Sequence, residues 1–179
     1  VPEVNASHAE LIHTQQKNRG WKGFVVPGPN CTTMGLIISL KPIYTKFGIK
    51  RVFMTSLQAL SGAGYPGVPS MDIVDNVIPY IAKEEGKVNL ETVKSLGAMV
   101  NGDVVNAPFP VSCTCTRVAT IDGHMLTIFV ETEKPITPAS YKEAIAEFNA
   151  TCRAEFGNLP SAPKETIAVK NEDNRPQPR

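Results

Sequence analysis

The chain has 179 residues, 42% of them hydrophobic and 20% charged, which is the composition of an ordinary globular protein with a sizeable core. A formal net charge of +1 argues against nucleic acid or an anionic membrane as an electrostatic partner. No apolar run approaches the roughly 20 residues of a membrane span, and no signal peptide is evident. Four cysteines in this length do not make a disulfide scaffold, so we expect a reducing, cytoplasmic compartment.

The first half of the chain predicts helices and strands in turn. Apolar spacing, capping residues and β-branched runs place five elements in chain order. They are a helix over 6–16 capped by Ser7, a short buried strand over 24–26, a helix over 33–46, a strand over 51–60, and a helix over 90–99 capped by Asn89. Between 61 and 82, glycines and prolines interrupt any longer helix.

The second half predicts a hairpin followed by a long helix. Two β-rich runs, 111–120 and 124–132, are joined by Asp122-Gly123, a strong two-residue hairpin signal. Thr137-Pro138 begins a helix that ends at Gly157, and 167–169 is read as a last strand. The inner face of that helix carries Tyr141, Ala144, Ile145, Phe148 and Cys152. Together these elements predict an α+β fold with a mixed, mostly antiparallel sheet and helices on one face.

A cysteine stands where the early strand gives way to a helix. The apolar run ends at Pro27-Gly28-Pro29, and Cys31 follows at the start of the helix, where a threonine can serve as cap. A thiol at this position faces the positive end of the helix dipole, which favours the nucleophilic thiolate. The alternative is a small residue buried at a helix entrance. The rest of the chain must decide between the two by supplying partners for a nucleophile.

The run Gly62 to Gly67 fits the spacing of a dinucleotide-binding fingerprint, but its context does not. The fingerprint opens a helix directly after a strand, whereas Pro66 and Pro69 block a helix here. Tyr65 is also bulky at a point that a phosphate must approach closely. We interpret the run as a sharply bent loop near a ligand, and no other Gly-rich turn in the sequence suits a dinucleotide.

Among the three histidines, His124 has the most informative neighbours. His8 and His13 lie on or beside the polar N-terminal helix, where we expect them to be solvated. His124 follows the predicted hairpin turn, so it would pair with Ile121 and share a face with Arg117, about 13 Å away along the strand. The pair would then grip opposite ends of a small ligand, or the polar face of the hairpin is simply exposed to water.

The remaining polar residues carry little weight individually. Glu84 and Lys87 stand three apart on a helix, which is usually a solvated ion pair. Gln58 lies in an apolar strand, where an amide needs hydrogen-bond partners or a function, and a satisfied core amide is the simpler interpretation. Cys113 and Cys115 are one residue apart, which fits neither a zinc site nor a thioredoxin-type pair, so we expect no metal.

Taken together, these stretches resemble one family, aspartate-semialdehyde dehydrogenase in its archaeal and fungal branch. The resemblance covers almost the whole chain in order. Its motifs are Pro29-Asn30-Cys31-Thr32-Thr33, Gln58-Ala59 with Ser61 to Gly67, Asp75 to Ile81, Glu84-Glu85 with Lys87, and Arg117 with Asp122-Gly123-His124. Each motif is weak alone, but their joint spacing is specific. The resemblance implies a catalytic domain like that of glyceraldehyde-3-phosphate dehydrogenase.

The resemblance also implies an activity and a set of roles. The reaction would be reduction of L-4-aspartyl phosphate to aspartate semialdehyde by NADPH with release of phosphate, a step toward threonine, methionine, isoleucine and, in many organisms, lysine. Cys31 would be the nucleophile, His124 the general acid/base, and Gln58 would orient the thioester. The substrate would be held by Arg117 at its α-carboxylate, Glu84 at its amino group, Lys87 at its phosphate, and Asn30 in the same pocket. Ser61, Gly62, Ala63 and Gly64 would lie beside the nicotinamide.

The same resemblance divides the chain into segments. Residues 1–30 would be the end of a nucleotide-binding domain with its connection, 31–170 the catalytic and dimerisation domain, and 171–179 a polar tail. The family's NADP-binding domain and extreme C-terminus would lie outside the sequence, which opens on Val1 without a methionine. We therefore expect residues 1–179 alone to be inactive. The expected partners are the small substrate and further copies of the chain, in a homodimer or homotetramer.

Two alternatives stay open. Malonyl-CoA reductase and N-acetyl-glutamyl-phosphate reductase also use a cysteine with a histidine, and the former is a close relative of this branch. The set of Glu84, Lys87 and Arg117 favours aspartyl phosphate. The other alternative, of a different class, is that the chain acts only as a dimerisation module.

Overall fold

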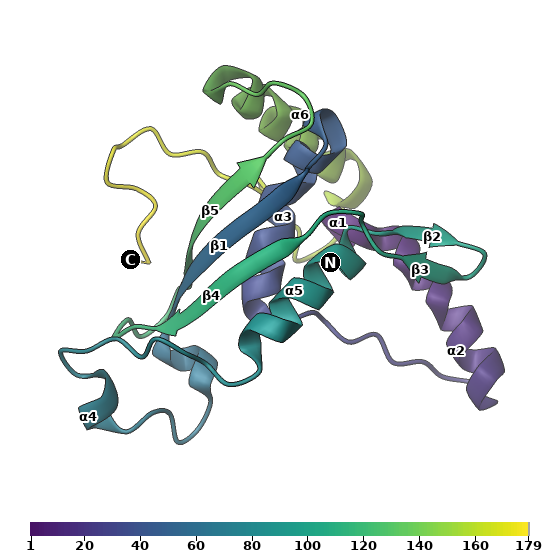
Figure 1. Cartoon of the computed structure of the whole chain (residues 1–179). Coiled ribbons are helices and arrows are strands. Elements are labelled where there is room, and N and C mark those ends of the chain that lie inside the picture. The colour runs from purple at the N-terminus through teal and green to yellow at the C-terminus, as the bar shows by residue number, and fades with distance from the viewer. Residues whose placement is uncertain (179) are drawn as a thin grey trace.

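The computed structural model describes residues 1–178, which form an α+β domain (Figure 1). Its helices are α1 (Pro2–Asn5), α2 (Leu11–Arg19), α3 (Cys31–Phe47), α4 (Ser70–Ile73), α5 (Glu84–Ser95) and α6 (Pro138–Phe156), with the 3₁₀ turns η1 (Ala6–Glu10) and η2 (Leu60–Ala63). Its strands are β1 (Arg51–Gln58), β2 (Ala98–Val100), β3 (Asp103–Val105), β4 (Val111–Arg117) and β5 (Met125–Glu131).

The main sheet has three strands in the order β4-β1-β5, with β1 in the centre. β1 runs parallel to β4 and antiparallel to β5, so the sheet is mixed as expected. Along β1, buried and exposed residues alternate, because successive side chains point to opposite faces of the sheet. The buried side of the sheet contributes Val52 and Met54 to the core, together with Leu36, Ile37 and Leu40 of α3.

The predicted hairpin between 111–120 and 124–132 is wrong. β4 and β5 do not pair with each other, because β1 lies between them. The segment after β4 instead binds η2, with the Leu60 and Ser61 N–H groups donating to the carbonyls of Thr120 and Ile121. An Asp-Gly pair indicates a tight turn, and Gly123 does adopt a positive φ of 87°, but a local turn signal cannot tell whether a third strand separates the two arms.

Helices α3 and α5 pack against one face of the sheet, α6 packs against α3, and the other face is left open (Figure 1). On the open face, Phe53 pairs in register with Phe129, and their side chains are 52% and 69% exposed. Beside them Thr55 lies in register with Thr114 on one side and Thr127 on the other. This arrangement confirms the expectation of helices on a single face.

Sequence reasoning located α6 more accurately than α5. Thr137 caps α6 through a capping box with Ser140, and the helix ends before Gly157 as predicted. The expected inner face of α6 is also confirmed, since Ala144, Ile145 and Cys152 are buried. In contrast, α5 spans Glu84–Ser95 rather than 90–99, so Asn89 lies inside the helix and is not its cap. The first helix is likewise split into α1, η1 and α2, and Ser7 falls within η1.

Two predicted strands, 24–26 and 167–169, form no strand in the structure. Each is instead held by a side-chain amide that imitates a neighbouring peptide. Gln15 donates to the Val25 carbonyl and accepts from the Val25 N–H, and Asn149 does the same for Ile167. Both segments therefore contain strand-forming residues, but no strand among the described residues lies beside them to pair with. No helix within residues 1–178 is long and apolar enough to span a membrane.

Candidate active site

Topology brings the functional candidates to one end of the sheet. β1 and β4 run parallel and end at Gln58 and Arg117, while the antiparallel β5 begins at the same end with Met125, directly after His124. Helix α3 also begins at this end, at Cys31 (Figure 1). Residues that are far apart in sequence therefore meet where the strands finish.

The central contact joins Cys31 and His124. Sγ of the exposed Cys31 lies 3.2 Å from Nε2 of His124. On the other side of the ring, the Ala59 N–H donates to Nδ1 at 3.1 Å. Because Nδ1 accepts this bond, the proton of the neutral ring must be on Nε2, and that N–H points at the sulfur. The arrangement places a histidine N–H donor against the sulfur of Cys31.

The surroundings of His124 favour its neutral form. Burial lowers the pKa of His124, and the positive charge of Arg117 lowers it further, whereas Glu84 acts in the opposite direction. The hydrogen bond from Ala59 agrees with this shift, because an imidazolium would turn a second N–H toward that donor.

Arg117 lies next to His124, rather than about 13 Å away as the hairpin register required. A Cβ placed on Gly62 would come 2.8 Å from Nη1 of Arg117 and 3.0 Å from Cε1 of His124, so both side chains lie against the same glycine. Arg117 is only 5% exposed, and its one side-chain hydrogen bond among the described residues goes to the Ala59 carbonyl at 2.7 Å. No carboxylate within residues 1–178 forms an ion pair with it.

Asn30, rather than a threonine, caps α3. Its Oδ1 accepts from the N–H groups of Thr32 at 2.9 Å and Thr33 at 3.3 Å. The helix consequently begins at Cys31, two residues earlier than predicted, and the nucleophile candidate is the first helical residue. The hydroxyls of Thr32 and Thr33 are themselves buried and make no hydrogen bond with the described residues.

Glu84 connects Asn30 to Gln58. Its Oε1 accepts from Asn30 Nδ2 at 2.8 Å and from Gln58 Nε2 at 3.2 Å, and Gln58 also donates to Ser56. Glu84 is 8% exposed, and its second oxygen accepts no hydrogen bond from the described residues. Lys87, one turn further along α5, is exposed and makes no side-chain hydrogen bond there. The structure thus brings together six of the seven predicted catalytic and substrate-binding residues and leaves Lys87 at the rim.

The four predicted cofactor-binding residues, 61–64, fall mainly within η2, beside the Cys31–His124 pair. Gly62 packs under the His124 ring, and Gly64, at a φ of 69°, has open space where a Cβ would be. The segment therefore offers backbone with little side-chain bulk next to the candidate nucleophile, which fits the approach of a flat ring.

Two residues that make hydrogen bonds in the site, Ala59 and Glu91, are not predicted from the sequence. Ala59 holds the site through its backbone, donating to His124 and accepting from Arg117, and a backbone contact leaves no signal in residue identity. Glu91 accepts the Asn30 N–H at 2.7 Å. Glu91 stands seven residues after Glu84 and so on the same face of α5, but this spacing is informative only once the helix is known to begin at residue 84.

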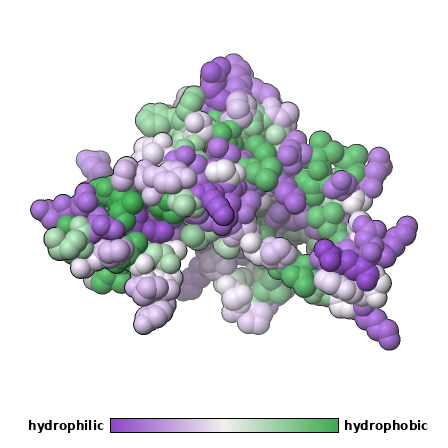
Figure 2. All heavy atoms as spheres, turned by 60° about the horizontal axis from the view of Figure 1, so that its bottom comes forward, coloured by the Kyte–Doolittle hydropathy of each residue, from purple (hydrophilic) through white to green (hydrophobic). Residues whose placement is uncertain are grey.

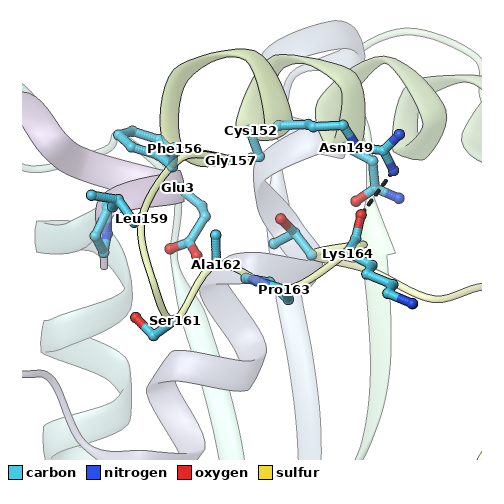
Figure 3. Close-up of a pocket in the computed structure, with 13 residues that line it drawn as sticks. Glu3, Asn149, Cys152, Phe156, Gly157, Leu159, Ser161, Ala162, Pro163 and Lys164 are labelled. Carbon is cyan, nitrogen blue, oxygen red and sulfur yellow. Dashed lines mark hydrogen bonds between the residues drawn. The ribbon is translucent and has the colours of Figure 1, made fainter.

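The other cysteines are less suited to nucleophilic chemistry. The neighbouring Cys115, burial and two nearby glutamates raise the pKa of Cys113, and burial raises that of Cys152. The pKa of Cys115 is lowered by the Cys113 thiol, but Cys115 is fully buried and cannot meet a substrate. Cys152 lines a cavity of about 180 Å³ between the N-terminal residues and the end of α6, where Glu3, Phe156 and Pro163 also lie (Figure 3). None of the predicted site residues lines this cavity. No cluster of three or more metal-binding side chains occurs within residues 1–178.

Seen from the end that carries the site, the surface shows hydrophobic residues in several separate groups among polar ones (Figure 2). Half of the exposed large apolar side chains belong to two connections, the one before α3 and the loop between η2 and α5. They are Trp21, Phe24, Val25 and Val26 in the first, and Tyr65, Met71, Val74, Val77 and Tyr80 in the second.

Comparison with known proteins identifies the family. The family model described as "Semialdehyde dehydrogenase, dimerisation domain" matches residues 40–179. The chain belongs to the semialdehyde dehydrogenase family. It is 46% identical, over its whole length, to aspartate-semialdehyde dehydrogenase of Methanothermobacter thermautotrophicus, of which it covers 51%. The crystal structure of the Candida albicans enzyme with NADP superposes with a TM-score of 0.84 at 38% identity, over 99% of this chain and 52% of that one.

These semialdehyde dehydrogenase relatives confirm the fold class and the resemblance stated from the sequence. The chain spans about half the length of the curated relatives it matches. A malonyl-CoA reductase (NADP) of Metallosphaera sedula is more distant, at 37% identity over 99% of the chain, so the alternative that it represents is not favoured.

Proposed function

We propose that this chain is the catalytic and dimerisation half of an aspartate-semialdehyde dehydrogenase, which converts L-4-aspartyl phosphate to aspartate semialdehyde with NADPH. The observation that carries the proposal is the 3.2 Å contact between Cys31 Sγ and His124 Nε2 at the start of α3. Similarity to aspartate-semialdehyde dehydrogenases over the full length of the chain supports the choice of reaction.

Cys31 supplies the nucleophile. Its thiolate attacks the acyl carbon of the substrate, a C–S bond forms, the C–O bond to phosphorus breaks, and phosphate leaves with the electron pair. The helix start and the His124 N–H both stabilise the thiolate before the attack. The product of this half-reaction is a thioester on Cys31.

NADPH, when bound by the remainder of the protein, supplies the hydride that reduces the thioester. Residues 61–64 form the part of this chain beside which the nicotinamide would lie. As the C–S bond breaks and the aldehyde leaves, the thiolate of Cys31 is regenerated. His124, held neutral with its proton on Nε2, donates a hydrogen bond to the sulfur and to the substrate oxygen while negative charge passes between them.

Two buried and unpaired charges are suited to an amino-acid substrate. The Arg117 guanidinium has several free donors and no carboxylate partner, so it binds the α-carboxylate, for which its planar donors are well shaped. The free oxygen of Glu84 binds the α-ammonium group, although the other oxygen is already engaged. A substrate with both charges on one carbon satisfies both residues. Lys87 and Asn30 complete the pocket, with Lys87 nearest the departing phosphate.

Residues 1–30 complete the nucleotide-binding part of the full protein, and 31–170 form the catalytic and dimerisation domain followed by a polar tail. Support comes from Phe24, Val25 and Val26, which are more than half exposed and without a sheet neighbour in the described chain. The open face of the main sheet, with its Phe53–Phe129 pair, is the proposed contact with a second copy in a homodimer or homotetramer. All four cysteines are free, as the cytoplasm requires.

The test is turnover by the full-length protein that contains this chain. The reverse reaction is convenient, because aspartate semialdehyde, phosphate and NADP⁺ should yield NADPH, which is followed by its absorbance. We expect activity that depends on phosphate and is absent with malonyl-CoA and NADPH in the forward assay. Turnover of malonyl-CoA, or none of either substrate, would contradict the proposal.

Alkylation by iodoacetamide separates a catalytic site from a dimerisation module. A preformed site requires Cys31 to react near neutral pH far faster than Cys113, Cys115 and Cys152. Equal and slow labelling of all four thiols would leave only the interaction role.

A further inference from the structure

We propose that Glu91 is a positioning residue for the nucleophile: its carboxylate fixes the backbone of Asn30 and so aims Cys31 at His124. The contact is short, with Glu91 Oε2 2.7 Å from the Asn30 nitrogen. The inference deepens the proposed function, on which it rests, by assigning a further residue to the same site.

Asn30 is held at every polar group. Its N–H donates to Glu91, its Nδ2 donates to Glu84, and its Oδ1 caps α3. Its carbonyl accepts the Met34 N–H at 2.9 Å, which is the first intrahelical bond. A residue constrained in this way fixes the position of the next one, and the next residue is Cys31.

Within residues 1–178, Glu91 is the only hydrogen-bond acceptor for a backbone N–H of the loop 27–30 that leads into the helix. Pro27 and Pro29 have no N–H, and the Gly28 N–H makes no hydrogen bond with the described residues. Among residues 27–30, only the Asn30 N–H is bound, and its acceptor is Glu91. Without this bond, the loop is tied to α5 only through the Asn30 side chain.

The lack of a cationic partner among the described residues indicates that the Glu91 carboxylate serves to hold the Asn30 backbone. Glu91 is half-buried, and no Lys or Arg among residues 1–178 forms an ion pair with it. Partial burial of a carboxylate is unfavourable unless strong donors compensate, and a backbone N–H at 2.7 Å is such a donor. Glu84 and Glu91 lie two turns apart on α5, so one helix grips both the side chain and the backbone of Asn30.

The consequence for chemistry follows from distance. Cys31 Sγ reaches His124 at 3.2 Å, and a displacement of the helix start by about 1 Å breaks that hydrogen bond and costs on the order of a hundredfold in rate. Glu91 touches neither the sulfur nor the histidine, so its effect must pass through Asn30.

Two substitutions separate geometry from charge. Glu91→Gln keeps an oxygen that accepts the Asn30 N–H but removes the negative charge, whereas Glu91→Ala removes both. Glu147→Gln is the control for the loss of one negative charge. Glu147 is an exposed carboxylate on α6 that pairs with Lys46 of α3. Each variant is made in the full-length protein and compared with the wild type.

The decisive measurement is the rate of Cys31 alkylation by iodoacetamide in the folded protein, which does not depend on the identity of the substrate. We expect Glu91→Ala to slow alkylation at least about tenfold, since the thiolate loses its donor, while Glu91→Gln and Glu147→Gln stay within about twofold of wild type. In turnover, kcat should fall for Glu91→Ala with KM little changed. If the proposed reaction is wrong, turnover fails in the wild type while the alkylation pattern still reports on Glu91.

Three results would overturn the proposal. One is equal alkylation in all four proteins. Another is faster alkylation in both Glu91 variants, which would mean that the carboxylate acts only through its charge. The third is a Glu91→Gln protein that alkylates Cys31 at least about tenfold more slowly than wild type although its melting temperature is unchanged. Should Glu91→Ala not fold, Glu91→Leu takes its place, because leucine fills a similar volume without an acceptor for the Asn30 N–H. Alkylation at least about tenfold slower than wild type then supports the proposal, and alkylation within about twofold of wild type overturns it.

Discussion

The two longest helices of the domain begin in different ways. At α6, Thr137 and Ser140 cap each other across three residues, so the cap is contained in the local sequence. At α3, the cap Asn30 is held in place by Glu84 and Glu91, which lie 54 and 61 residues further along the chain. The local cap serves the helix, whereas the non-local cap also fixes the backbone directly before Cys31, the proposed nucleophile.

The difference shows how a fold can hold an exposed side chain, here that of the proposed nucleophile, without burying it. Cys31 is exposed, so few contacts can fix the side chain itself. The structure instead fixes the backbone immediately before it, using two carboxylates from a helix that packs against α3. Cys152 in α6 illustrates the opposite case, a thiol held by burial and unavailable to a substrate.

The largest expected effect tests whether the nucleophile is Cys31 at the start of α3 or Cys152 within α6. Cys31→Ser should abolish turnover of aspartate semialdehyde in the full-length protein, because a serine hydroxyl stays protonated where a thiolate is required. Cys152→Ser should retain it, since burial raises the pKa of that thiol and keeps it un-ionised. The measurement is kcat/KM for both variants. A Cys31→Ser enzyme with activity close to wild type would remove the nucleophile from the mechanism.

The next effect compares the two caps directly. Asn30→Ala and Thr137→Ala should each lower the free energy of unfolding by about 1–2 kcal/mol, the usual cost of a lost cap. Only Asn30→Ala should also lower kcat, by on the order of a hundredfold, because only that cap holds Cys31. Urea denaturation and steady-state kinetics measure the two quantities.

Asn30→Ser serves as the control for this comparison. A serine caps a helix as well as asparagine does, but it has no amide N–H to donate to Glu84 and adds no charge beside that carboxylate. Stability near wild type with reduced kcat would show that the link to α5, and not the cap alone, positions the nucleophile. Equal activity in Asn30→Ala and Thr137→Ala would contradict the distinction between the two helix starts.

The same contrast explains what the sequence could predict. The start of α6 and its buried face follow from Thr137-Pro138 and from helical spacing, which are local signals. The position of Cys31 at a helix entrance was also predicted, but its cap was assigned to a threonine because the cap's real partners lie on α5. The strand order was missed for a similar reason, since nothing in residues 118–124 records that β1 separates β4 from β5.

Most site residues were located through their resemblance to a family rather than through their own chemistry. Gln58 looked like a core amide and Glu84 like a solvated charge, and the structure shows both buried and bonded to each other. Contacts made by backbone atoms, such as those of Ala59, leave no trace in residue identity. The roles of these residues in catalysis stay predictions.

The smallest expected effect concerns the pH dependence that His124 introduces at the α3 end. Its pKa is lowered in the folded protein, first by burial and then by Arg117, from an ordinary value near 6.5. In the pH range between the lowered value and 6.5, the unfolded chain binds a proton that the folded chain does not, so stability rises with pH there. The stabilisation is fully present above about pH 6.5 and is lost as the pH falls through the folded value.

The variant His124→Asn tests this pH dependence, because it keeps an acceptor for the Ala59 N–H but cannot titrate. Urea midpoints at about pH 7.5 and about pH 5.5 should therefore differ more in the wild type than in the variant. If acidification instead stabilised the wild type relative to His124→Asn, His124 would be protonated in the folded protein. The hydrogen bond from the Ala59 N–H would then have to be broken.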